Sequence, residues 1–155
     1  MRKLNIVFVC LGNYCRSPMA EAVFKKLALD DGLLEQMNVS SAGTKNWDVG
    51  LKPDHRAIRE LEKHHYPHDP EKRAQQINKS MHQEADYLIA MSRSIAQELG
   101  NGKNIHLLLD FASDIIDRDI PDPYPTDTFP QAFDLIEKGV KAFYNDIKRK
   151  HFKED

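Results

Sequence analysis

Short apolar runs rich in β-branched residues alternate along the chain with longer segments in which apolar residues recur every three or four positions. The short runs predict strands at 4–9, 38–42, 87–91 and 105–109. The periodic segments predict helices at about 18–29, 54–64, 79–84, 94–99 and 129–150. Because strands and helices alternate, the pattern predicts a single α/β domain over residues 1–155, built on a parallel sheet.

Composition and charge are those of a globular domain and exclude several other classes of protein. Hydrophobic residues make up 41% and charged residues 30%, which excludes a collagen-like or wholly disordered chain. The net charge is −2, so nothing global favours nucleic acid or an anionic membrane. No apolar run approaches the roughly 20 residues that span a bilayer. The run 4–9 is interrupted by Asn5 and no small-residue cleavage site follows it, so we expect a cytoplasmic protein.

Two charged or histidine-rich segments have plainer interpretations than binding sites. The basic stretch 148–153 is expected to be a solvated helix end rather than a nucleic-acid site. His64, His65 and His68 are expected to form a surface turn. A metal site is the alternative, but no cysteine or carboxylate stands at ligand spacing.

The two cysteines, Cys10 and Cys15, lie in one short segment. A small secreted fold would use more cysteines, spread along the chain, and a zinc site would need further ligands. In a reducing compartment this pairing indicates either reactive thiols or chance.

The segment 10–17 joins the first predicted strand to the first predicted helix. Ser17 is expected to cap that helix, with Pro18 in its first position and Glu21 in its first turn. Successive backbone N–H groups at such a junction can converge on an anion. Gly12 would let the backbone approach a phosphate, and the planar guanidinium of Arg16 matches two phosphate oxygens at once.

Cys10 lies at the base of this loop, where N–H dipoles and the charge of Arg16 favour the thiolate. A thiolate that faces a bound phosphate is a nucleophile for phosphoryl transfer through a phosphocysteine. Ser17 could donate a hydrogen bond to the sulfur. A buried Cys10 beside a solvent-exposed Arg16 is the alternative, but the surrounding glycine, Asn13 and serine favour the anion loop.

An aryloxide leaves faster when an acid protonates it, and the conjugate base of that acid can later activate water. Asp122 is the candidate, because the prolines at 121, 123 and 125 restrict the backbone around its carboxylate. A plain proline-rich turn is the alternative interpretation of this segment.

The segment 7–22, VFVCLGNYCRSPMAEA, resembles the signature of the low-molecular-weight protein tyrosine phosphatases. Segments 41–44 and 47–50 resemble that family's second strand and following loop, 86–91 resembles its third strand, and 122–124 resembles its general-acid motif. The resemblance implies a four-stranded parallel sheet flanked by helices on both faces, with the phosphate-binding loop between the first strand and the first helix. It also implies hydrolysis of phosphotyrosine in protein substrates without metal or cofactor.

The resemblance assigns roles to particular residues. Cys10, Arg16 and Asp122 would be catalytic. Phosphate binding and loop support would fall to Leu11, Gly12, Asn13, Tyr14, Cys15, Ser17 and Ser41. Trp47 and Tyr124 would be the walls between which an aromatic ring slides. A cysteine at position 15 recurs in the family, so Cys15 is expected to be a redox partner of Cys10; a small buried core residue is the alternative.

The chain departs from the family at several positions. Tyr14 stands where tyrosine-specific members commonly have isoleucine and phosphoarginine-specific members threonine. Pro125 replaces a second tyrosine after the general-acid motif. Lys72 and Gln75 stand where the family often has histidine and arginine, so we expect different support of the phosphate loop.

Three other functions compete with tyrosine phosphatase activity. A protein arginine phosphatase would use the same scaffold, and we rank it second because Tyr14 offers no carboxylate to a guanidinium. An arsenate reductase would need further cysteines, and none follows Cys15. A phosphocarrier or phosphate-binding module would need neither Arg16 nor Asp122.

Overall fold

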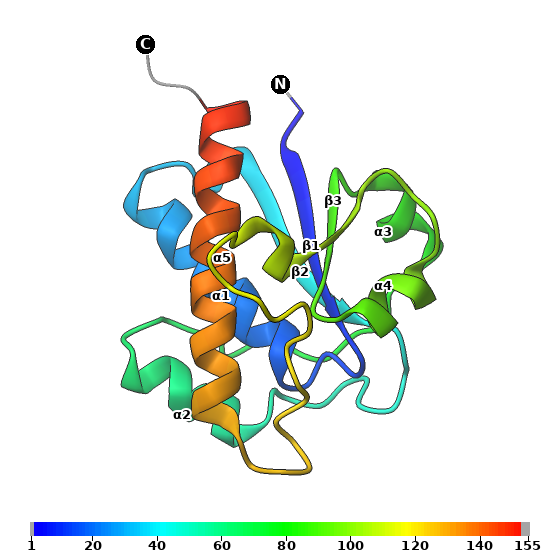
Figure 1. Cartoon of the computed structure of the whole chain (residues 1–155), viewed down its shortest axis with the longest axis vertical. Helices are drawn as coiled ribbons and strands as arrows, with labels where there is room; N and C mark the ends of the chain where they lie inside the picture. The colour runs from blue at the N-terminus through cyan, green and yellow to red at the C-terminus, as the bar shows by residue number, and fades with distance from the viewer. Residues whose placement is uncertain (1, 153–155) are drawn as a thin grey trace.

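The computed structural model describes residues 2–152, which form one α/β domain (Figure 1). Four strands form a parallel sheet in the order β2-β1-β3-β4: β1 Leu4–Cys10, β2 Met37–Gly43, β3 Tyr87–Ala90 and β4 Ile105–Leu107. The helices are α1 Arg16–Asp30, α2 His55–Lys63, α3 Lys79–Glu84, α4 Arg93–Leu99 and α5 Phe129–His151. Two 3-10 turns, Leu34–Gln36 and Leu108–Phe111, complete the structure. The predicted fold class is confirmed.

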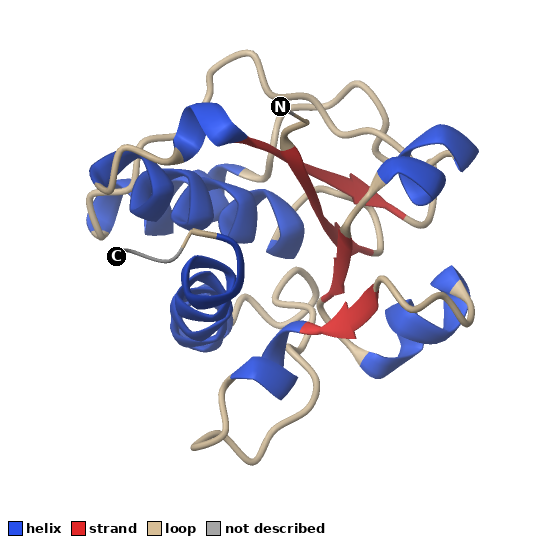
Figure 2. Ribbon diagram, turned by 90° about the horizontal axis from the view of Figure 1, so that it is seen from above, coloured by secondary structure: helices blue, strands red, loops and turns tan. Residues whose placement is uncertain are grey.

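Side chains of β1 alternate between two hydrophobic cores, one on each face of the sheet. Phe8 and Ile6 enter the larger core, and Val7 and Val9 enter the smaller one. Helices α1 and α5 cover the face with the larger core, and α3 and α4 cover the other face (Figure 2). This alternation follows from the two-residue period of a strand. A strand that is apolar on both faces is typical of a buried parallel sheet.

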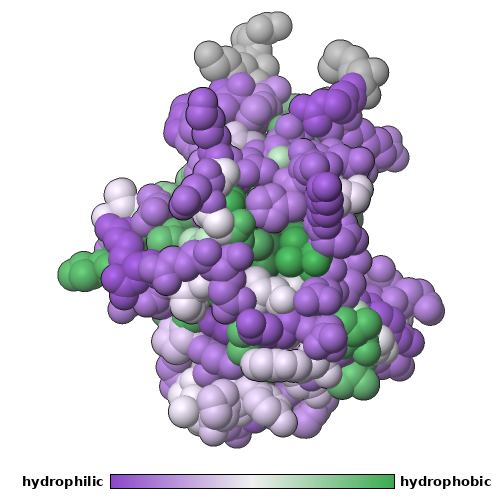
Figure 3. Space-filling model, turned by 90° about the vertical axis from the view of Figure 1, so that its right-hand side faces the viewer, coloured by the Kyte–Doolittle hydropathy of each residue, from purple (hydrophilic) through white to green (hydrophobic). Residues whose placement is uncertain are grey.

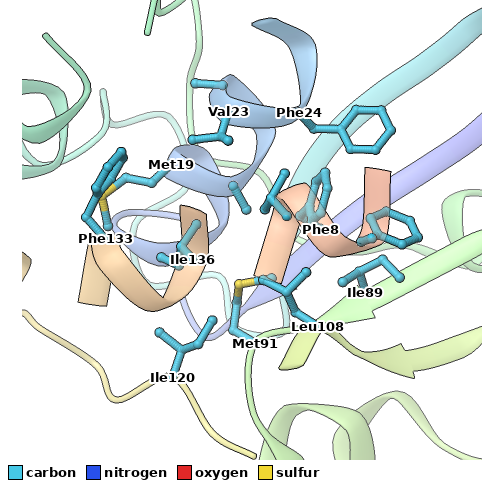
Figure 4. Packing of buried hydrophobic residues seen from close by; sticks show 14 of the residues in the cluster. Phe8, Met19, Val23, Phe24, Ile89, Met91, Leu108, Ile120, Phe133 and Ile136 are labelled. Carbon is cyan, nitrogen blue, oxygen red and sulfur yellow. The ribbon is translucent and has the colours of Figure 1, made fainter. Parts of the chain in front are cut away.

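The larger core is a close-packed set of aromatic and aliphatic side chains between the sheet and two helices (Figure 4). Met19, Val23 and Phe24 come from α1, and Phe133 and Ile136 come from α5. The Phe24 ring lies 5.8 Å from the Phe8 ring. In contrast, the face that α3 and α4 present to solvent is mostly polar, with small separate apolar patches (Figure 3).

Three local predictions are wrong. Helix α1 begins at Arg16, so Ser17 is not its cap; Cys15 precedes the helix and gives no side-chain cap. Glu21 lies beyond the first turn, which holds no acidic residue. The fourth strand ends at Leu107 because the chain there enters a 3-10 turn. Local propensity placed the helix start too late, because the turn into α1 is fixed by contacts with distant segments.

Among residues 2–152, no helix is both long enough and apolar enough to cross a membrane.

Candidate active site

The loop between β1 and α1 lies at the carboxyl edge of the sheet, where Cys10 ends a central strand beside Gly43. In open parallel sheets, ligands bind outside the carboxyl ends of the strands. Cys10 is 2% exposed and Asn13 is fully buried, with φ at +58°. Asparagine tolerates this left-handed conformation better than most residues, and the turn it allows brings the loop back toward the start of α1.

Hydrogen bonds from three segments fix the shape of this loop. The Asn13 amide Nδ2 donates to Ser17 Oγ at 2.8 Å and to Ser41 Oγ at 2.9 Å. Its Oδ1 accepts from the Gln75 backbone N–H at 3.0 Å. Ser17 Oγ lies 2.9 Å from Cys10 Sγ, so the serine holds the sulfur directly. Buried polar groups whose donors and acceptors are all hydrogen-bonded favour a single loop conformation.

Lys72 and Gln75, two of the residues at which the chain departs from the family, both contact Ser41. Lys72 Nζ donates to the Ser41 carbonyl at 3.1 Å, and Gln75 Nε2 donates to the same oxygen at 3.0 Å. Glu21 Oε1 accepts from Ser41 Oγ at 2.5 Å and lies 3.5 Å from Lys72 Nζ. Burial lowers the pKa of Lys72, while the Glu21 carboxylate opposes that shift. The loop is therefore braced from behind by an ammonium–carboxylate pair. The sequence did not indicate that Glu21 supports the loop, because Ser41 and Lys72, which it contacts, are distant along the chain.

Arg16 is 7% exposed, and its Nη1 donates to the Ile120 carbonyl at 2.9 Å. The Ile120 N–H in turn donates to the Met91 carbonyl just after β3. The arginine therefore connects the phosphate loop to the segment that carries Asp122. The Asp122 carboxylate accepts the Tyr124 backbone N–H at 3.1 Å, which orients it within its turn.

The predicted residues converge on one cleft of about 400 Å³. Its lining combines the phosphate loop, the loop after β2 and the segment before α5: Cys10, Leu11, Gly12, Tyr14, Cys15, Arg16, Trp47, Asp48, Leu51, Asp122 and Tyr124. Asn13, Ser17 and Ser41 lie behind it, fully buried. A larger hollow of about 540 Å³ lies near the amino ends of β1 and β3 and contains none of the predicted residues.

Two exposed aromatic side chains line the mouth of this cleft. Trp47 is 67% exposed and Tyr124 is 55% exposed. The Tyr14 ring meets the Tyr124 ring edge-on at 6.0 Å. Burial, followed by the charge of Asp54, raises the pKa of Tyr14, so its hydroxyl stays neutral.

Arg56 holds the segment that carries Tyr124, a role that sequence reasoning did not find. Its guanidinium lies 5.1 Å from the Tyr124 ring and pairs with Asp54 at 2.9 Å and with Asp127 at 3.3 Å. The Asp54 backbone N–H donates to the Tyr14 carbonyl at 2.9 Å. This arginine therefore couples the phosphate loop to the wall of the cleft.

Cys15 lines the same cleft, and both cysteines are free thiols. Cys15 is 5% exposed, and burial, followed by the charge of Asp54, raises the pKa of its thiol well above the usual range. It is therefore protonated at neutral pH.

A cysteine at the end of a central parallel strand, followed by a tight turn and a buried arginine at the start of the next helix, is the arrangement expected of a cysteine-dependent phosphatase. The sequence profile of the family described as "Low molecular weight phosphotyrosine protein phosphatase" matches residues 5–153. The chain therefore belongs to this family.

Individual relatives agree with this assignment. The low molecular weight protein-tyrosine-phosphatase YfkJ of Bacillus subtilis is 34% identical over 155 residues, covering 94% of this chain and 97% of its own. Low molecular weight protein-tyrosine phosphatase A of Mycobacterium tuberculosis is 38% identical over 92% of this chain and 90% of its own. The crystal structure of YfkJ superposes with a TM-score of 0.93 at 33% identity, covering 97% of this chain and 98% of that chain. That of the Drosophila arginine phosphatase superposes with a TM-score of 0.81 at 31% identity, covering 97% and 98%.

Proposed function

We propose that this enzyme hydrolyses phosphotyrosine in cytoplasmic proteins through a phosphocysteine on Cys10. The observation that carries the proposal is the convergence of Cys10, Arg16 and Asp122 on one cleft. A thiolate, a planar cation and a carboxylate are the three groups that this reaction needs.

In the first step, the Cys10 thiolate attacks phosphorus in line with the tyrosyl oxygen. The S–P bond forms while the P–O bond breaks, and Asp122 donates its proton to the departing phenolate. The loop N–H groups hold the equatorial oxygens of the transferring group. Arg16 Nη1 is bound to Ile120, which leaves Nε and Nη2 as the pair that faces phosphate.

In the second step, the Asp122 carboxylate takes a proton from water as the water oxygen attacks phosphorus. The S–P bond breaks, phosphate leaves, and the thiolate is restored. The Ser17 hydroxyl, 2.9 Å from the sulfur, stabilises it as the leaving group. No step requires a metal or a cofactor.

Substrate preference follows from the depth of the cleft and from its aromatic walls. The thiolate at its base is reached by a long aryl ester more easily than by phosphoserine. Trp47 and Tyr124 add stacking that only an aromatic ring uses. Phosphoarginine ranks second as a substrate. Structural relatives named arginine phosphatases support it. The Tyr14 ring, which contacts the Tyr124 ring near Asp122, narrows the cleft and argues against it.

The direct test uses p-nitrophenyl phosphate and matched peptides that carry phosphotyrosine, phosphoserine or phosphoarginine, all in the presence of EDTA. We expect undiminished turnover with EDTA, and a kcat/KM for phosphotyrosine at least about tenfold above the others, or about 1.4 kcal/mol. A higher value for phosphoarginine would make the protein an arginine phosphatase. Phosphate binding without any turnover would make it a binding module.

Asp122→Asn should slow poor leaving groups most, because a good leaving group departs without protonation. We expect a loss of at least about 100-fold with phenyl phosphate, the size of a general-acid contribution, and a much smaller loss with p-nitrophenyl phosphate. Steady-state kinetics across a series of aryl phosphates measures the difference. Asp117→Asn, an exposed acid outside the cleft, is the matched control. An equal loss for all leaving groups would give Asp122 another role.

Cys15 is proposed to protect Cys10 from irreversible oxidation. Peroxide converts the Cys10 thiolate to a sulfenic acid, and the Cys15 sulfur then displaces water from it to give a disulfide. Peroxide-treated wild type should recover with dithiothreitol, and Cys15→Ser should not. Because the pKa of Cys15 is raised, its thiolate is scarce at neutral pH, and closure should accelerate as pH rises. Equal recovery of both proteins, with no Cys10–Cys15 disulfide in peptide mass spectra, would contradict the idea.

A further inference from the structure

Asp48 places a second carboxylate in the cleft, and the mechanism above does not use it. It follows Trp47 in the loop after β2 and lines the cleft together with Asp122. Its carboxylate lies directly against the phosphate loop, since a Cβ added to Gly12 would overlap it. A larger residue at position 12 would have to displace the Asp48 carboxylate from the loop.

The charge of Asp48 has no counterpart among residues 2–152. No lysine, arginine or histidine there lies within ion-pair distance, and its side chain makes no hydrogen bond to those residues. Several acidic residues on neighbouring segments have a cationic partner: Asp54 and Asp127 share Arg56, and Asp119 pairs with Arg93 at 2.9 Å. The cleft therefore has an acidic wall close to the site where a phosphate dianion must bind.

This placement is unfavourable for the phosphate alone, because like charges at short range repel. It becomes favourable when the substrate brings a cation with its phosphate. A residue next to phosphotyrosine is separated from it by one Cα–Cα step of about 3.8 Å, and a lysine has a long flexible stem. The apolar stem can lie along Trp47, Val49 and Leu51, which are half or more exposed beside Asp48.

We propose that Asp48 is a specificity-determining residue that selects phosphotyrosine flanked by a basic side chain. The inference rests on the proposed tyrosine phosphatase function and adds the sequence context of the substrate. Asp48 contacts the flanking ammonium or guanidinium, while Arg16 and the loop bind the phosphate.

The test compares three synthetic peptides, Ala-Ala-X-phosphotyrosine-X-Ala-Ala with X as lysine, glutamine or glutamate, hydrolysed by the wild type and by Asp48→Asn. In the wild type, kcat/KM should be at least about threefold higher for lysine than for glutamine, the effect of one partly exposed ion pair, and lowest for glutamate. The lysine-to-glutamine ratio should approach one in Asp48→Asn. It should also fall in the wild type as salt screens the pair.

Asp114→Asn is the matched control, because it removes the same charge from an exposed position outside the cleft. It should keep the wild-type ratio. Equal hydrolysis of the three peptides by the wild type, or an unchanged ratio in Asp48→Asn, would overturn the inference. If neither p-nitrophenyl phosphate nor any peptide is hydrolysed, the proposed function itself has failed, so the two failures are distinguishable.

Discussion

Cys10→Ser should reduce turnover of p-nitrophenyl phosphate by at least about 10⁴-fold, the scale on which removal of a catalytic nucleophile acts. A serine hydroxyl is a far weaker nucleophile toward phosphorus than a cysteine thiolate, so the efficient attacking group is lost. The loop that binds phosphate remains, because Asn13, Ser17 and Ser41 keep their hydrogen bonds to one another. The variant should therefore still bind inorganic phosphate, as measured by calorimetry.

Thermal unfolding of the Cys10→Ser protein provides the control, since the change removes little volume from a buried position. A Tm close to that of the wild type, together with phosphate binding, would show that the fold and the loop are intact. Full activity in this variant would show that the Cys10 sulfur is not the nucleophile and would end the phosphocysteine mechanism.

Arg16→Lys should lower kcat by about 10³-fold, comparable to the loss of an arginine that stabilises phosphoryl transfer elsewhere. The ammonium of lysine is a point charge and cannot bridge two equatorial oxygens. A lysine also cannot donate to the Ile120 carbonyl while presenting two further parallel donors to phosphate, as the guanidinium does.

Arg93→Lys is the matched control for this substitution. Arg93 is exposed and pairs with Asp119, so the same chemical change occurs at a surface ion pair outside the cleft. We expect Arg93→Lys to keep nearly full activity, because exposed ion pairs contribute little. A drop of less than about tenfold in Arg16→Lys, or about 1.4 kcal/mol, would show that Arg16 does not bind the transition state.

The periodicity of the sequence predicted every strand and every α-helix, because burial on a sheet or against a helix face imposes its period locally. The segment 10–17 could be interpreted as an anion-binding loop, because it joins a strand to a helix and contains Gly12 and Arg16. Ser17 was misread as a cap because the same residue type serves both tasks. The hydrogen bond expected between its hydroxyl and the Cys10 sulfur is present in the structure, at 2.9 Å.

The sequence alone does not show which residues from distant segments contact one another at the edge of the sheet. Glu21 and Asp48 lie in segments that resemble the family, but nothing in the sequence indicates which residues they or Arg56 contact. Their roles depend on which segments the parallel sheet places at one edge. Lys72 was noticed as a departure, but its contact with the Ser41 carbonyl depends on how the segment after α2 docks beside β2.

The bracing of the phosphate loop has a consequence for how the protein acquires activity. Asn13 is held by Gln75, 62 positions further along the chain, and Gly43 pairs with Gln76 beside it. Contacts of such long range form only after the intervening chain has closed a large loop, which is slow compared with helix formation. We therefore expect the anion site to be completed late in folding, after the helices have formed. For the same reason, the octapeptide 10–17 moved alone into another scaffold would carry the nucleophile without the framework that keeps it aimed at phosphorus.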